Sequence, residues 1–118
     1  MIKAHYNLLL ALLALSMLSA CSLGDTSLAW NKIHEGAQLI DVRTAGEYQD
    51  GHLPGAKLIP VDELASRLDE LGDDKTRPVV VYCKSGVRSS RAQKLLTENG
   101  FTDVVNGGGY ASLMSVKP

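Results

Sequence analysis

Short apolar runs alternate with amphipathic segments along most of this chain. Four runs rich in β-branched and other apolar residues predict strands at residues 38–42, 57–59, 79–82 and 102–105. Apolar residues at helical spacing predict helices at 27–35, 45–50 and 61–71, and a further helix from residue 92 to a stop signal at 99–100. Strands that alternate with helices predict an α/β fold, a small parallel β-sheet with helices on both faces.

A six-residue turn, residues 83–88, follows the strand at 79–82 and leads into a helix N-terminus. The first amide groups of a helix lack intrahelical partners and carry partial positive charge. Lys84 and Arg88 add formal positive charge, while Ser85 and Gly86 are small enough for backbone N–H groups to close around an anionic atom. We therefore expect the thiol of Cys83 to have a lowered pKa and to be partly ionised near neutral pH.

A second interpretation of Cys83 is structural. A cysteine after a valine-rich strand is commonly a small apolar residue of the core. The cationic turn of small residues favours a reactive thiol, because a purely structural cysteine does not need such a turn.

Polar residues also follow the other predicted strands. Asp41 and Arg43 come at the end of the strand 38–42, and the segment 106–109 follows the last strand. Since ligands of parallel sheets bind at the carboxyl ends of the strands, we expect these residues and the turn 83–88 to gather at one edge. Thr44 and Glu47 match a capping box, and Arg43 is expected to form a local ion pair with Glu47.

The N-terminal segment, residues 1–20, has the composition of a secretory signal peptide. Lys3 precedes an apolar run at residues 8–18 that is too short to span a membrane. Residues 18–21, Leu-Ser-Ala-Cys, resemble the lipobox of bacterial lipoproteins, which implies cleavage before Cys21 and a lipid on that residue. The alternative is ordinary signal cleavage near residue 20.

These features predict an exported protein on the periplasmic side of the cell envelope, with three parts: a signal peptide at 1–20, a short tether at 21–26 and one domain at 27–118. In lipoproteins of this type an aspartate after the lipidated cysteine directs retention in the inner membrane. Ser22 stands at that position here, which favours the outer membrane.

Charge and cysteine content exclude several classes of protein. The formal net charge is −1, and loss of residues 1–20 would leave 11 basic and 13 acidic residues with no basic cluster. This pattern argues against binding to nucleic acid or to anionic lipid headgroups. If Cys21 carries a lipid, Cys83 is the one remaining thiol and no internal disulfide can form. We expect a monomer.

Two separated motifs resemble the rhodanese family. The first comprises residues 39–43, 47–48 and 51–56, and the second is the segment 83–89. The resemblance covers most of residues 37–110. It implies a thiosulfate sulfurtransferase that needs neither metal nor cofactor, in which Cys83 becomes a persulfide and passes its sulfur to cyanide or a thiol. It also implies that the donor is bound by the residues of the loop: Lys84, Ser85, Gly86, Val87 and Arg88.

Two other functions are compatible with parts of this pattern. A non-catalytic sulfur-carrier or binding module could use the same fold, although the presence of Cys83 counts against this alternative without excluding it. A phosphatase or arsenate reductase is disfavoured, because such relatives have one more residue between cysteine and arginine. The chain also departs from the family near its end, where the tryptophan that often follows the paired glycines is missing and Trp30 is the only tryptophan.

Overall fold

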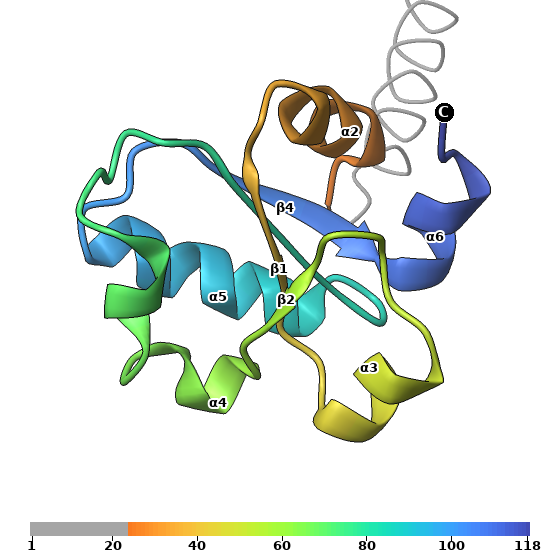
Figure 1. The fold of residues 1–118 in the computed structure, drawn as a ribbon, viewed down its shortest axis with the longest axis horizontal. Coiled ribbons are helices and arrows are strands. Elements are labelled where there is room, and N and C mark those ends of the chain that lie inside the picture. Colours follow the sequence, from red (N-terminus) through yellow and green to blue (C-terminus); the bar gives the residue numbers. More distant parts are fainter. Residues whose placement is uncertain (1–23) are drawn as a thin grey trace, which may run out of the picture.

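The computed structural model describes residues 24–118, so the predicted signal peptide, Cys21 and the first part of the tether lie outside the described residues. Four parallel strands form one sheet in the order β2-β1-β3-β4. Within residues 24–118 no helix has the length and apolar character needed to cross a membrane. The elements, shown in Figure 1, are α2 (Thr26–His34), β1 (Gln38–Asp41), α3 (Ala45–Asp50), β2 (Lys57–Leu58), α4 (Val61–Leu64), the 3-10 helix η1 (Leu68–Leu71), β3 (Val79–Cys83), α5 (Val87–Glu98), β4 (Val104–Gly109) and α6 (Tyr110–Ser115).

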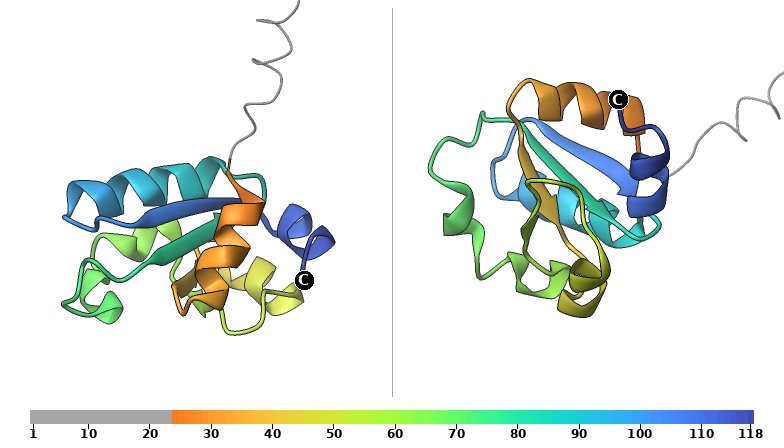
Figure 2. Two further views of the ribbon diagram at one scale, coloured as in Figure 1. Left: turned by 90° about the horizontal axis from the view of Figure 1, so that it is seen from above. Right: turned by 45° about the vertical axis from the view of Figure 1, so that its right-hand side comes forward.

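Helices cover both faces of the sheet, which confirms the predicted fold class. Figure 2 shows α5 on one side of the strands and α2 on the other. The central strand β3 is buried along its whole length, with alternate residues entering two separate apolar clusters. Val81 and Cys83 pack in the cluster that contains Ala92 of α5, whereas Tyr82 packs with Trp30 of α2.

Local sequence signals predicted several elements correctly. Helix α3 spans the expected residues 45–50 and begins with the predicted capping box. In that capping box the Thr44 hydroxyl accepts a hydrogen bond from the Glu47 amide at 3.3 Å, and the Glu47 carboxylate accepts one from the Thr44 amide at 3.1 Å. Helix α2 and strand β1 differ from the expected ranges by one residue at their ends.

The predicted continuous helix at 61–71 is wrong. The chain forms the short helix α4, leaves helical geometry near Arg67 and re-enters as the 3-10 helix η1. A 3-10 helix has three residues per turn, so Leu68 and Leu71 still fall on the same side and reach the core. The apolar spacing therefore predicted the buried positions correctly but not the helix type.

The last strand begins later and is longer than the predicted 102–105, because β4 continues through the glycines at 107–109 that were expected to follow it. Its pairing with β3 shifts from Val81 opposite Asn106 to Cys83 opposite Gly109, which is a β-bulge. At Gly109 an added Cβ would clash with the carbonyl oxygen of Lys84. The absence of a side chain therefore lets β4 pass directly beneath the segment that follows Cys83.

A buried ion pair holds the carboxyl end of β1. Arg43 donates to both carboxylate oxygens of Asp41, with the shortest distance 2.7 Å, and to the carbonyl of Gly51 at 2.7 Å. The Tyr82 hydroxyl donates to Asp41 at 2.8 Å and accepts from the Leu53 amide at 3.1 Å. The expected pair between Arg43 and Glu47 is wrong, because Asp41 binds the Arg43 guanidinium with two-point geometry.

The first prediction concerns this ion pair. Replacing Arg43 by alanine should lower the free energy of unfolding by about 3–5 kcal/mol, because the fully buried Asp41 carboxylate would lose its cation. Urea denaturation followed by circular dichroism measures this loss. The matched control is Arg91→Ala, whose pair with Asp62 is exposed and 3.4 Å long and should contribute less than about 1 kcal/mol. Equal losses in the two variants would contradict the assigned role of Arg43.

The second prediction concerns the passage of β4 beneath the segment after Cys83. Gly109→Ala should destabilise the protein by about 1–3 kcal/mol, because the new methyl group would displace the Lys84 carbonyl. The backbone of Gly109, with φ −96° and ψ 146°, suits alanine, so any cost comes from the clash. Gly46→Ala, where nothing lies within 4 Å of the added Cβ, is the control and should be neutral or slightly stabilising. A Gly109→Ala variant as stable as the control would refute the close contact.

Candidate active site

Cys83 is the last residue of β3, and a loop of three residues, 84–86, joins it to the first turn of α5. This helix begins at Val87, earlier than the apolar spacing from Ala92 indicated, so Val87 and Arg88 belong to the helix. Gly86 adopts a left-handed backbone conformation with φ +94°. That conformation lets the chain turn from the loop into α5 and favours glycine over residues with a side chain.

The sulfur of Cys83 accepts hydrogen bonds from the amides of Gly86 at 3.0 Å and Ser89 at 3.4 Å. The Ser89 hydroxyl lies 3.4 Å from the same sulfur. Burial opposes ionisation of the thiol, but these groups, together with the Ser85 amide, favour the thiolate, and the net effect lowers the pKa of Cys83. The direction agrees with the sequence prediction, while the main favourable contributions are hydrogen bonds rather than the charges of Lys84 and Arg88.

Cys83 has no exposed surface (0%), so its sulfur lies beneath the loop and not at the molecular surface. Burial by itself fits the structural interpretation of this cysteine. Several polar donors directed at one sulfur do not fit it, because a core thiol needs no such partners. Lys84 and Ser85 are exposed and contribute nothing to the apolar core. Because the sulfur is buried, a small solute can reach it only after the residues that cover it move.

Arg88 is held by Glu47 of α3 in a two-point ion pair. The distances from the Arg88 Nη1 and Nη2 atoms to the Glu47 oxygens are 2.7 and 3.0 Å. The hydrogen bonds from Arg88 lower the pKa of Glu47 to about 2, although burial of the carboxyl group acts in the opposite direction. The pair therefore stays charged throughout the neutral pH range. The sequence assigned Arg88 to the site and Glu47 to the architecture, whereas the structure joins the two side chains.

Two buried polar residues near the sulfur were given no individual role from the sequence, although Ser89 belongs to the second motif and Asn106 to the segment expected at the same edge. Ser89 lies in the first turn of α5 and Asn106 lies in β4, and their side chains are 2.7 Å apart. The Asn106 amide also donates to the Gly86 carbonyl at 3.2 Å. No sequence signal indicated that these two side chains contact each other.

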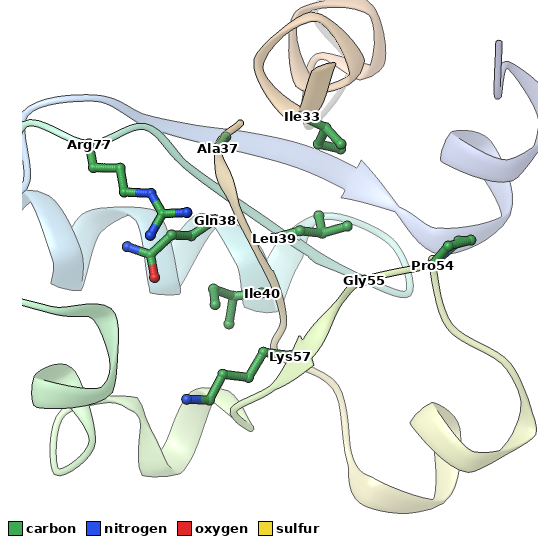
Figure 3. A pocket seen from close by; sticks show the side chains of 9 residues that line it. All are labelled: Ile33, Ala37, Gln38, Leu39, Ile40, Pro54, Gly55, Lys57 and Arg77. Carbon is green, nitrogen blue, oxygen red and sulfur yellow. The ribbon is translucent and has the colours of Figure 1, made fainter. Parts of the chain in front are cut away.

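The cavities on the part of the molecule that the structure describes include the following two. One, of about 310 Å³, lies beside the active-site loop and is lined by Lys84, Ser85, Gly108 and Gly109 together with Gly24, Thr26 and Ser112. The other, of about 340 Å³, lies between α2, β1 and the segment after Pro54 (Figure 3). None of the residues that line the second cavity belongs to the segment 83–88.

Comparison with known proteins identifies the family. The sequence model of one protein family, the rhodanese-like domain, matches residues 25–114 of this chain. The YqhL protein of Bacillus subtilis is 47% identical over 70 residues, a match that covers 59% of this chain and 54% of that relative. The thiosulfate sulfurtransferase PspE of Escherichia coli is 40% identical over 78 residues, which cover 66% of this chain and 75% of PspE.

A solved structure, described as a rhodanese with anions from E. coli, superimposes with a TM-score of 0.62 at 39% identity. The match covers 64% of this chain and 89% of that one. Together these similarities show that the chain belongs to the rhodanese-like domain family, which includes sulfurtransferases such as PspE.

Proposed function

We propose that this protein is a sulfurtransferase that takes a sulfane sulfur from thiosulfate, or a related donor, onto Cys83 and passes it to cyanide or a thiol. The observation that carries the proposal is the pair of backbone amides, those of Gly86 and Ser89, that donate hydrogen bonds to the Cys83 sulfur. These donors favour the thiolate, which is the nucleophilic form of cysteine. Membership of a family with thiosulfate sulfurtransferases adds support at the level of the reaction type.

The proposed reaction has two steps. The Cys83 thiolate attacks the outer sulfur of thiosulfate, a new S–S bond forms, and the original S–S bond breaks with its electron pair leaving on sulfite. The acceptor then attacks the outer sulfur of the persulfide, and the electron pair of that S–S bond returns to Cys83. Cyanide gives thiocyanate and a thiol gives a new persulfide, so the cycle needs no oxidant or reductant.

The loop residues have distinct proposed roles in binding the donor. Lys84 lies exposed at the rim and attracts a dianion. The amides of Ser85, Gly86 and Val87 provide hydrogen-bond donors for the transferred sulfur, in the manner of an oxyanion hole. Arg88 keeps donors free after its two-point contact with Glu47, because a guanidinium carries five N–H groups.

The closeness of the loop to Cys83 disfavours the phosphatase and arsenate reductase alternatives. The Gly86 amide contacts the sulfur directly at 3.0 Å. A phosphate or arsenate group bonded to the sulfur would have to place its oxygens in the space between the sulfur and the loop amides. The short distance leaves no room for such a group unless the loop expands. One additional sulfur atom requires a smaller expansion of the same loop.

We further propose that the protein is exported, with residues 1–20 as signal peptide and Cys21 as the lipid-bearing residue. Asp25 donates its amide hydrogen to the Asn106 carbonyl at 2.8 Å, so the folded domain includes residues before 27. Gly24 lines the cavity beside the active-site loop. A lipid on Cys21 would then hold this cavity close to the membrane surface.

The third prediction tests the covalent step. After treatment with thiosulfate the protein should gain the mass of one sulfur atom, and Cys83→Ala should gain none. With cyanide present, the wild type should also release thiocyanate continuously. If the wild type fails to gain mass, or if the variant gains as much, the assignment of Cys83 is wrong. A mass gain without continuous release of thiocyanate would contradict the proposed enzymatic activity and would support the alternative of a non-catalytic sulfur carrier.

The fourth prediction concerns Arg88. Arg88→Ala should lower kcat/KM for thiosulfate about tenfold or more, because one charge-assisted hydrogen bond to the donor is lost. Arg91→Ala, on the same helix but with an exposed side chain, is the control and should leave the kinetics unchanged.

Arg88→Ala also uncovers the negative charge of Glu47, so the double variant Arg88→Ala/Glu47→Gln separates the two effects. The double variant should remain impaired if Arg88 binds the donor. Full recovery in the double variant, or unchanged kinetics in the single one, would remove Arg88 from the proposed role.

A further inference from the structure

A buried chain of polar side chains leads away from the Cys83 sulfur. The Ser89 hydroxyl oxygen is 3.4 Å from the sulfur and 2.7 Å from the Asn106 Oδ1 atom. Ser89 has no exposed surface (0%) and Asn106 is 9% exposed, so their polar atoms depend on protein partners. Nothing in the reaction steps described above uses either side chain.

The orientation of the Asn106 amide group is fixed by two backbone partners. The Gly86 carbonyl can only accept and lies 3.2 Å from Nδ2, while the Gly108 amide can only donate and lies 2.9 Å from Oδ1. The atom of Asn106 that faces Ser89 is therefore an acceptor. It follows that the Ser89 hydroxyl donates its proton to Asn106.

A hydroxyl group has one proton, so Ser89 cannot donate to Asn106 and to the sulfur at the same time. In the arrangement observed, the hydrogen between the sulfur and Ser89 has to come from the Cys83 thiol. When the thiol loses its proton to solvent, two acceptors remain for the Ser89 hydroxyl, the thiolate and Oδ1. Oδ1 keeps the Gly108 amide as a donor even when Ser89 turns away.

We propose that Ser89 and Asn106 are positioning residues that form a proton switch beneath Cys83. In the thiol form the Ser89 hydroxyl donates to Asn106, and in the thiolate form it turns and donates to the sulfur. Asn106 competes with the thiolate for this proton and so sets how easily Cys83 ionises. The relevance of this switch to catalysis rests on the proposed function. The switch itself can be tested separately, because ionisation of the thiol can be measured without any sulfur donor.

The charged groups around the switch are already paired in ways that do not involve Ser89 or Asn106. Arg88 of α5 pairs with Glu47 of α3, and Asp41 pairs with Arg43 after β1. On the side of α4, Asp62 pairs with Arg91, and Lys84 is exposed on the loop. Substitutions at Ser89 and Asn106 remove no charge, so a shift in the pKa of Cys83 would report on the hydrogen bonds.

The fifth prediction is tested by the rate of alkylation of Cys83 with iodoacetamide as a function of pH. Modification is assigned to Cys83 by mass spectrometry of its peptide. Ser89→Ala should raise the midpoint of the profile by about one pH unit, because the thiolate loses a hydrogen bond. Ser90→Ala, the neighbouring residue of α5, should leave the midpoint unchanged, and Ser89→Thr, which keeps a hydroxyl, should stay near the wild type.

Asn106→Ala gives the distinctive result, because it should lower the midpoint by releasing the Ser89 proton to the sulfur. In a Ser89→Ala background the same change should have no effect on the midpoint. The midpoint is the readout, since a looser loop would change the rate at every pH equally. An unchanged midpoint in Ser89→Ala, or the same shift from Asn106→Ala in both backgrounds, would overturn the switch. If Asn106→Ala does not fold, the comparison of Ser89→Ala with Ser89→Thr decides.

Discussion

The sulfur of Cys83 lies where water does not reach it, and this burial is the constraint on which the rest of the site depends. A buried thiolate is unfavourable unless the protein supplies hydrogen-bond donors. The chain supplies them from the loop and first turn that follow Cys83, through the backbone amides of Gly86 and Ser89. The left-handed backbone of Gly86, the start of α5 at Val87 and the polar contact with Asn106 all serve this arrangement.

The architecture keeps this loop in place from two sides. On one side, β4 runs beneath the loop and comes so close at Gly109 that a side chain would clash with Lys84. On the other side, the ion pair between Arg88 and Glu47 ties the first turn of α5 to α3.

Several local features of this structure and its fold class were predictable from the sequence, whereas the helix type at 68–71, the partner of Arg43 and the side-chain contacts between distant residues were not. The capping box of Thr44 and Glu47 and the strand that ends at Cys83 are local patterns, and both were predicted correctly. Glu47 pairs with Arg88 across 41 residues, and Ser89 contacts Asn106 across 17. No local periodicity reports such contacts, and the glycines after Asn106 were expected to follow the last strand although they continue it.

The central claim is that sulfur passes through a covalent intermediate on Cys83. Steady-state rates of thiocyanate formation, measured while thiosulfate and cyanide are varied independently, test it most directly. Because sulfite leaves before the acceptor reacts, double-reciprocal plots at different cyanide concentrations should be parallel lines. Lines that intersect would mean that both substrates must be bound together before any product leaves, and would contradict the persulfide mechanism.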